Sequence, residues 1–349
     1  IKILSGDHSG TVLNIASAAG VPVGTTHLTG EQVAAMSDEQ LREEAGRVDI
    51  YTRMFPEAKL RVIEALKAAG ETVAMTGDGV NDGPALKAAH IGIAMGERGT
   101  ETARQAADLV ISDDNLDRIT EAIRHGRTIY ANLKKAIRYL ITIHIPILTT
   151  ASLPVLLGWK YPTVFAPIHL IFLEIVMGPT CSIFYERESV EGDILSKPPR
   201  GKERGARGEQ RGGWARSEQR GLLARGEVGR AILQGGVAAM GMLGLYFYFM
   251  QHDYSLEYTR TMVFDTLVID NILLTFVNRS FNKGIFTMLR QPNPLMAPVL
   301  LSSTGFFVIM NMWPMVMGLF GLTHLLWADM LLCAGVSFVS VIWIEFFKR

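Results

Sequence analysis

Short apolar runs alternate with helical patterns over residues 1–125, whereas long apolar runs dominate from Ile137 onward. The short runs predict strands at residues 1–4, 49–52, 72–75, 91–95 and 109–111. Helical patterns lie between them, at residues 11–19, 28–47, 56–69 and 101–106. The 28–47 pattern contains a capping box formed by Ser37 and Gln40. Strands that alternate with helices are typical of a doubly wound parallel sheet, so we expect an α/β domain in residues 1–125.

The long apolar runs predict six transmembrane helices, because about 20 apolar residues are needed to cross the hydrocarbon core. They occupy residues 137–157, 163–185, 231–250, 261–277, 296–317 and 322–347. A helical pattern that starts at Asn115 continues into the first of them, with Pro146 and Pro154 inside it. We therefore expect a stalk with two membrane helices in 126–185, a loop in 186–230 and an all-α region with four more membrane helices in 231–349.

Lysine and arginine are concentrated in the loops 186–230 and 279–290 and at the last two residues, Lys348 and Arg349. The loops between these regions contain almost none. Basic loops face the cytoplasm in most membrane proteins. The basic loops and the α/β domain fall on the same side of the predicted helices. The pattern therefore predicts an integral membrane protein whose soluble domain and C-terminus are cytoplasmic.

Composition adds little that points to other partners. The formal net charge of the 349 residues is zero, which gives no reason to expect nucleic acid. Both cysteines, Cys181 and Cys333, lie in apolar runs and are expected to pack between helices. Residues 201–221 are rich in Arg, Gly and Glu and are expected to form a disordered loop; RNA binding is a minor alternative. Because Ile1 lies inside a strand pattern, we expect the natural N-terminus to lie upstream.

The loop that follows the 72–75 run carries the clearest chemistry. Asp78, Asn81 and Asp82 lie within five residues among several glycines. Loops at the carboxyl ends of parallel strands hold the ligands of α/β sheets. Hard oxygen ligands at this spacing suit Mg²⁺, which takes one or two carboxylates together with phosphate oxygens and water. The alternative is an Asp-Gly turn without a ligand.

Two further positions suggest phosphate chemistry. Ser5, Gly6 and Asp7 follow the first strand and precede a helix, and unpaired amides at a helix start favour phosphate. Lys59 lies one turn inside the helix that begins at Pro56, and by position alone it would be an ordinary solvated lysine, as most lysines on helix surfaces are.

Ionisable side chains inside predicted membrane helices are costly unless they serve a pathway or find a partner. They are His144, Glu174, Asp265 and Asp270. We predict that Glu174, in an otherwise apolar run, is a ligand of a transported cation. Asp270 is the second candidate, and His144 and Asp265 are expected mainly to be structural hydrogen-bonding residues.

The sequence TGDGVNDGPAL, at residues 76–86, resembles the hinge motif of the P-type ATPases, although Gly83 replaces the usual alanine. This resemblance implies a haloacid-dehalogenase-like phosphorylation domain that uses Mg²⁺ and ATP. It implies that Asp78, with its neighbours Gly77 and Gly79, binds the catalytic Mg²⁺. Asn81 and Asp82 would support the metal and phosphate.

The same resemblance extends to other segments. Ser5-Gly6-Asp7 is similar to the family's Thr-Gly-Asp, whose hydroxyl and amide hold the phosphoryl group. The phrase around Lys59 is similar to the family's Ala-Arg-Val-x-Pro-x-x-Lys, which implies that Lys59 neutralises charge as the phosphoryl group moves. Compared with calcium pumps, the membrane helices carry few oxygen ligands around Glu174 and His144, which argues against Ca²⁺ without excluding it.

The family's Asp-Lys-Thr-Gly strand, which supplies the phosphorylated aspartate, does not occur in the sequence, and neither does a nucleotide-binding domain. The resemblance therefore implies the C-terminal part of a pump, with ATP bound mainly by an absent N-terminal part. The chain resembles bacterial pumps most, and this resemblance implies that the protein lies in a bacterial plasma membrane. The alternative is a non-catalytic membrane protein derived from a pump.

Overall fold

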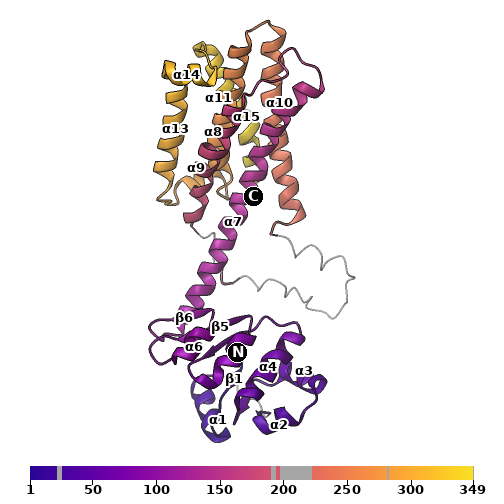
Figure 1. Ribbon diagram of the computed structural model, residues 1–349, viewed down its shortest axis with the longest axis vertical. Helices are drawn as coiled ribbons and strands as arrows, with labels where there is room; N and C mark the ends of the chain where they lie inside the picture. Colours follow the sequence, from indigo (N-terminus) through magenta and orange to yellow (C-terminus); the bar gives the residue numbers. More distant parts are fainter. Residues whose placement is uncertain (22–25, 190–193, 197–221, 281–282, 349) are drawn as a thin grey trace. The chain divides into compact units, whose positions relative to one another are not determined.

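The computed structural model describes residues 1–21, 26–189, 194–196, 222–280 and 283–348. They form two compact units, Ile1–Ala122 and Ile123–Arg349 (Figure 1). The predicted Arg, Gly and Glu-rich loop at 201–221 lies outside the described residues.

The described residues of the first unit form six strands, and every pair among them is parallel, as the sequence predicts. They form two three-stranded sheets, whereas alternation alone predicted one doubly wound sheet. The first sheet has the order β1 (Ile3–Leu4), β3 (Ile50–Thr52), β2 (Leu28–Thr29). The second has the order β4 (Ala74–Gly77), β5 (Ile91–Met95), β6 (Leu109–Ile111). Among the described strands, β1 and β4 each pair on one side only.

Helices cover these sheets at nearly the predicted positions. They are α1 (Ser9–Ala18), α2 (Gly30–Ala35), α3 (Asp38–Arg47), α4 (Pro56–Ala68), α5 (Gly83–Ala88), α6 (Glu101–Ala106) and the 3₁₀ turn η1 (Val80–Asp82). The continuous 28–47 helix is a correction: Thr29 and Ser37 each form a capping box, so each begins a helix of its own.

Helix α4 joins the two halves of this unit. Its inner face buries Ala58, Val62 and Leu66 in an apolar core that also includes residues of both sheets, Tyr51 and Met75. One side of α4 packs against α2 and α3, and the other packs against α5 and η1. The helix therefore holds the loop after β4 beside its own first turns.

The second unit is helical. Its elements are α7 (Asp117–Leu156, beginning in the first unit), α8 (Pro167–Phe172), a π-helical turn η2 (Leu173–Met177), α9 (Gly178–Ser182), η3 (Ile183–Arg187), α10 (Arg225–Gln251), α11 (Leu256–Val277), α12 (Ile285–Leu289), α13 (Met296–Met312), α14 (Pro314–Phe320), α15 (Trp327–Ile342) and η4 (Trp343–Phe347). Helix α11 lies at the centre and packs against both α10 and α15.

Helical segments occupy all six predicted spans, but not all are simple membrane helices. Among the described residues, three are long and apolar enough to cross a membrane: Asp117–Leu156, Arg225–Gln251 and Trp327–Phe347. The pair α13 and α14, bent by 88°, makes a fourth if it is one span. Helix α11 is not among them because it carries the charged residues Arg260, Asp265 and Asp270. In the second predicted span, the apolar helix is limited to Pro167–Met177.

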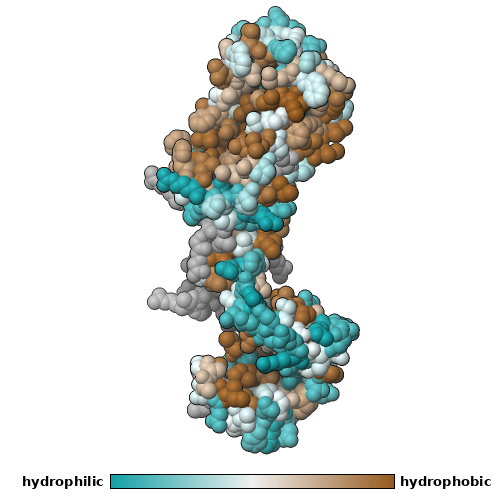
Figure 2. Space-filling model, turned by 90° about the vertical axis from the view of Figure 1, so that its left-hand side faces the viewer, coloured by the Kyte–Doolittle hydropathy of each residue, from teal (hydrophilic) through white to brown (hydrophobic). Residues whose placement is uncertain are grey.

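The outer surface of the helical unit is rich in exposed apolar side chains, which appear as brown areas in Figure 2. Leu148, Ile175 and Leu331 are among them, on three different helices. A soluble surface rarely exposes so much apolar area, so this surface suits contact with lipid. Cys333 is buried, as expected for a packing residue, whereas the side chain of Cys181 lies outside the described residues.

Candidate functional site

The loop after β4 brings two of the predicted residues into direct contact. Lys59 Nζ on α4 lies 2.6 Å from Asp82 Oδ1, and the two side chains are only 12% and 10% exposed. The backbone amide of Gly79 donates a further hydrogen bond of 3.4 Å to Asp82 Oδ2. An ion pair this sheltered from water fixes the orientation of both groups. Lys59 on α4 is therefore paired with the β4 loop through Asp82 and is not a solvated surface lysine.

Gly77 makes this arrangement possible. A Cβ atom at position 77 would lie 2.6 Å from the Asp82 Cβ and 2.9 Å from its Oδ2. The end of β4 must therefore lack a side chain for Asp82 to fold back against it. The sequence identified the glycines of this loop, and the structure gives the packing reason for Gly77.

Asp78 and Asn81 remain exposed at the same strand end. The Asp78 carbonyl accepts a hydrogen bond of 2.8 Å from the Thr100 amide, which fixes the backbone while its carboxylate faces solvent. Within the described residues, no group of three or more His, Cys, Asp or Glu side chains is arranged to hold a metal. One exposed carboxylate beside a neutralised one nevertheless fits Mg²⁺, which completes its shell with water and phosphate oxygens.

The predicted phosphate loop after β1 is also well defined. The Asp7 amide donates to Ser5 Oγ at 3.2 Å, and Ser5 Oγ lies 3.3 Å from Asp7 Oδ2. The Ser5 amide bonds to the Tyr51 carbonyl at 3.0 Å, which holds the loop on β3. No hydrogen bond or ion pair joins Ser5, Gly6 or Asp7 to the β4 loop in the described part of the chain. Both loops follow the carboxyl ends of parallel strands, β1 and β4.

Two other aspartates near these strands, Asp108 and Asp114, accept hydrogen bonds from the backbone. Asp108 Oδ2 accepts a hydrogen bond of 2.8 Å from the Gly92 amide. Asp114 accepts hydrogen bonds from the amides of Glu97 and Arg98, at 3.0 and 2.9 Å. Burial raises the pKa of the Asp114 carboxyl, but these amide bonds outweigh burial and hold the pKa below its usual value.

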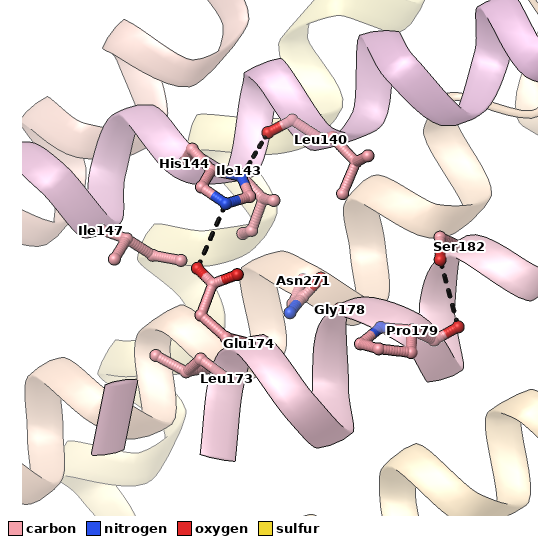
Figure 3. Close-up of a pocket in the computed structure, with 10 residues that line it drawn as sticks. All are labelled: Leu140, Ile143, His144, Ile147, Leu173, Glu174, Gly178, Pro179, Ser182 and Asn271. Atoms are coloured by element: carbon pink, nitrogen blue, oxygen red, sulfur yellow. Dashed lines mark hydrogen bonds and ion pairs between the residues drawn. The ribbon is translucent and has the colours of Figure 1, made fainter. Parts of the chain in front are cut away.

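In the helical unit, His144 and Glu174 meet in one cavity of about 200 Å³ (Figure 3). His144 Nε2 lies 3.1 Å from Glu174 Oε1, and His144 Nδ1 lies 2.7 Å from the Leu140 carbonyl. Glu174 stands on the π-helical turn η2, and such turns are frequent at functional sites. The two residues therefore form a polar pair on facing segments, α7 and η2.

Asn271 on α11 also lines this cavity, and sequence reasoning missed it. Tyr139 donates a hydrogen bond to Asn271 Oδ1, which holds the amide in place. The only signal in the sequence was its position beside Asp270. Asp270 itself does not line the cavity: it is fully buried, and both of its carboxylate oxygens lack a hydrogen bond within the described residues.

Asp265 is held by a neighbouring helix, as expected for a structural residue. Its Oδ1 accepts a hydrogen bond of 3.1 Å from Asn311 Nδ2 on α13. It is 2% exposed and does not reach the Glu174 cavity. Asp265 thus ties α11 to α13.

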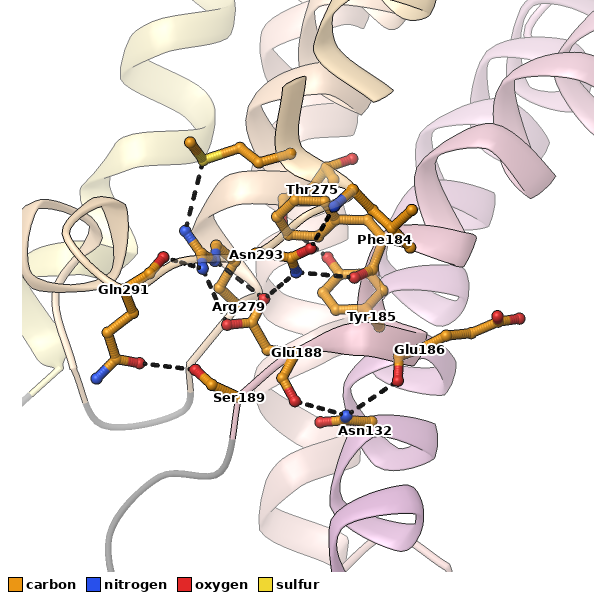
Figure 4. A network of polar contacts seen from close by, with 12 residues as sticks. Asn132, Phe184, Tyr185, Glu186, Glu188, Ser189, Thr275, Arg279, Gln291 and Asn293 are labelled. Carbon is orange, nitrogen blue, oxygen red and sulfur yellow. Dashed lines mark hydrogen bonds and ion pairs between the residues drawn. The ribbon is translucent and has the colours of Figure 1, made fainter. Parts of the chain in front are cut away.

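A buried polar network that the sequence did not predict lies where η3 and α11 end (Figure 4). Arg279 binds both oxygens of Glu188, at 2.9 and 3.1 Å, and neither side chain is exposed. Asn293 Nδ2 donates to Glu188 Oε2 at 2.8 Å. Arg279 also donates to the Gln291 carbonyl at 3.1 Å and lies over the Phe184 ring. The network fastens the chain after η3 to the chain after α11.

Comparison with known proteins agrees with both units. Residues 3–90 match the haloacid dehalogenase-like hydrolase family, and residues 214–349 match the family described as cation transporting ATPase, C-terminus. A relative named calcium-transporting ATPase 1, from Lactococcus lactis, is 30% identical over 348 residues, which are 99% of this chain and 37% of the relative. The calcium-transporting ATPase of Bacillus subtilis is 30% identical over 96% of this chain and 36% of its own length.

A human relative, calcium-transporting ATPase type 2C member 1, is 37% identical over 57% of this chain and 22% of its own length. The chain thus matches little more than a third of the length of the two bacterial relatives and less of the human one. The family matches and the relatives point to the same family as the structure does, with its parallel sheets, its β4 loop and its apolar helices. The chain belongs to the family of cation-transporting P-type ATPases and matches its C-terminal region.

Proposed function

We propose that the chain is part of an ATP-driven cation pump, in which it handles the phosphoryl group and carries part of the cation path. The observation that carries this proposal is the sheltered ion pair between Lys59 and Asp82 at the carboxyl end of β4. A lysine cation buried against the β4 loop is suited to stabilise charge that moves during phosphoryl transfer. An ordinary surface lysine is solvated and does not form a buried ion pair of this kind.

Each residue of the loop then has a role. Asp78 would hold Mg²⁺, which neutralises charge on the phosphoryl oxygens when it is bound. Asp82 orients Lys59, and Lys59 supplies the positive charge. The Gly6 amide would donate a hydrogen bond to a phosphoryl oxygen, and the Ser5 hydroxyl, which donates to Asp7 Oδ2 in the structure, would turn from Asp7 to a phosphoryl oxygen. Asn81, exposed beside Asp78, would support the metal shell.

The edges of the two sheets indicate where the strand that carries the phosphorylated aspartate would pair. The strands β1 and β4 are both edge strands, and each leads into one of the two loops. A parallel strand between them, with an aspartate at its carboxyl end, would satisfy both edges and deliver that aspartate between the loops. Such a strand, and the ATP site, would come from a part of the complete protein outside these 349 residues.

The cation path would pass through the cavity of His144, Glu174 and Asn271. It offers the Glu174 carboxylate, the Asn271 amide, the Ser182 hydroxyl and one imidazole, and a set with so few oxygen ligands fits a cation that keeps some of its water. Asp270 would be a second acidic position, reached by a movement of α11 or used in another state of the pump. The relatives' names favour Ca²⁺ as the first ion to test.

The proposed location is a bacterial plasma membrane, with the α/β unit in the cytoplasm. The excess of Lys and Arg in alternate loops supports this orientation. A protease added to sealed inverted vesicles would cleave the α/β unit in this orientation, and protection of that unit would contradict it.

The first experiment concerns phosphorylation. The 349 residues alone are expected to form no acid-stable phosphoenzyme with labelled ATP and Mg²⁺, because the nucleophile is absent. After joining to the N-terminal part of a relative, the label is expected to appear. Asp78→Asn should abolish it, whereas Asp38→Asn, at a carboxylate that is 97% exposed on α3, should not. Unchanged labelling of Asp78→Asn would remove this residue from the metal site.

The second experiment concerns the cation. In the joined protein, Glu174→Gln should lower ATPase activity at limiting cation without lowering the amount of protein in the membrane. Glu257→Gln, in the first turn of α11, is the matched control. Titration with Ca²⁺, Mn²⁺, Na⁺, K⁺ and H⁺ identifies the ion, and equal midpoints for both variants would place the site elsewhere.

A non-catalytic membrane protein derived from a pump is the second candidate, because the chain lacks the nucleophile. If the joined protein folds but forms no labelled phosphoenzyme, the result contradicts the pump proposal and favours this alternative.

A further inference from the structure

A second cavity in the helical unit, of about 310 Å³, lies away from Glu174 and is lined by basic and apolar side chains. The basic residues come from three elements far apart in the sequence: Arg138 on α7, Arg230 on α10 and Lys348 just after η4. The apolar lining consists of Leu233, Trp343, Ile344 and Phe347. None of these residues belongs to the proposed phosphate or cation sites.

The charges around this cavity are unequal. Lys348 Nζ bonds to Glu345 Oε1 at 2.6 Å, and Lys134 Nζ bonds to Glu227 Oε1 at 2.7 Å. These two carboxylates and the Tyr185 hydroxyl are among the groups whose charge favours the charged form of Arg138, while the charge of Arg230 opposes it. Arg138 is only 2% exposed, so water screens this repulsion poorly. An anion in the cavity would offset the repulsion between the arginines.

The apolar lining indicates what else that anion carries. Leu233 and Phe347 are 56% and 75% exposed, so they continue the cavity onto the outer apolar surface of the unit. Trp343 lies beside them, and tryptophan is frequent where membrane helices meet the headgroup region. A soluble anion needs no such apolar wall, whereas a lipid places its acyl chains there.

The three basic residues also lie where apolar helices end. Arg230 precedes the apolar part of α10, Arg138 precedes that of α7, and Lys348 follows η4. Under the orientation predicted from the basic loops, these ends face the cytoplasmic leaflet, where anionic lipids are abundant. Basic pockets between membrane helices on that side bind phosphate-bearing headgroups.

We propose that the cavity between α7, α10 and η4 binds the phosphate headgroup of an anionic phospholipid, with Arg138, Arg230 and Lys348 around the phosphate and Leu233 and Phe347 against the acyl chains. Arg230, the exposed member, is the contact that a substitution removes with least effect on folding.

The test uses the 349-residue chain in detergent micelles, with lipid binding followed by native mass spectrometry. The probes are phosphatidylglycerol, phosphatidylcholine and inorganic phosphate. Phosphatidylglycerol is expected to bind tightest, and Arg230→Gln should weaken it about fivefold, as loss of one basic contact implies. Arg230→Lys should retain most of the affinity. Arg225→Gln is the matched control, an exposed arginine on the same helix outside the cavity.

Equal binding of the two lipids, or equal affinity of Arg230→Gln and Arg225→Gln for phosphatidylglycerol, would overturn the proposal. If inorganic phosphate competes with phosphatidylglycerol at similar concentration, the lipid assignment is wrong and the cavity is a site for a soluble phosphate. Circular dichroism of each variant confirms that a loss of binding does not reflect unfolding. None of these measurements involves ATP, so their outcome is independent of the proposed pump activity.

Discussion

Glu188→Gln is expected to destabilise the helical unit strongly. The change keeps the size of the side chain but leaves Arg279, which has no exposed surface, without its carboxylate. It also turns an acceptor into a donor at one of two positions. Either that amide faces the Arg279 guanidinium, or it faces Asn293 Nδ2, which now donates to Glu188 Oε2 at 2.8 Å. Both orientations bring two donors together inside the network.

Removal of one partner from a buried ion pair costs about 3–5 kcal/mol, because the other charge stays buried without compensation. Arg279 keeps its bond to the Gln291 carbonyl and its contact with the Phe184 ring, so we expect the lower end, about 3 kcal/mol. The free energy of unfolding can be measured by titration with sodium dodecyl sulfate, followed by circular dichroism. Glu186→Gln, at an exposed glutamate two residues earlier, is the control and should change it by less than about 0.5 kcal/mol.

A double-mutant cycle tests whether the pair itself is responsible. Arg279→Met should also destabilise, because it leaves Glu188 buried and charged, and the double variant should lose less than the sum of the two. The reasoning is refuted if Glu188→Gln unfolds at the same detergent fraction as Glu186→Gln. It is also refuted if the two substitutions in the cycle are additive.

Three further predictions concern the α/β unit. Lys59→Met should lower its unfolding free energy by about 1–3 kcal/mol, since it leaves Asp82 poorly exposed and without its cation; urea titration of the chain measures this, and no change would show that the ion pair is solvated. Gly77→Ala should destabilise by about 1–3 kcal/mol because its Cβ would overlap Asp82, and double substitution with Asp82→Gly should recover part of the loss; a neutral Gly77→Ala would disprove the overlap. The pKa of Asp114 is held below its ordinary value near 3.8, so its stabilising effect is present above that pH and is lost as pH falls through the lowered pKa. Asp114→Asn, which tolerates the φ of 50° at this position, should therefore flatten the acid limb of a plot of urea midpoint against pH, and an unchanged limb would contradict this.

The sequence predicted the α/β unit well where local signals are strong. The helical patterns predicted at residues 11–19 and 56–69 end within a residue of α1 and α4, and each is followed by a glycine, Gly20 or Gly70, that has positive φ. The predicted bounds of β5, α6 and β6 agree with the structure. These elements depend on period, caps and turns, all of which are written in neighbouring residues.

Contacts between distant residues could not be predicted in the same way. The pairing of Arg279 with Glu188 joins positions 91 residues apart, and Arg279 alone looks like any basic loop residue. Asn271 reaches the Glu174 cavity only because α11 lies beside α7 and α9, an arrangement that periodicity does not encode. The division of the strands into two sheets likewise depends on which edges meet. Helical segments occupy all six predicted membrane spans, but α11 carries the charged residues Arg260, Asp265 and Asp270, which are more than a simple membrane helix usually contains.

The edge strands β1 and β4 have a consequence for the chain when it is produced by itself. Both β1 and β4 present backbone amides and carbonyls on one side without a partner strand among the described residues, and β4 carries no charged side chain that would hinder an approaching strand. Unprotected edges of this kind pair readily with another copy of the same strand. Self-association through sheet edges is therefore expected during purification. A short peptide that pairs with β1 and β4 should keep the chain soluble.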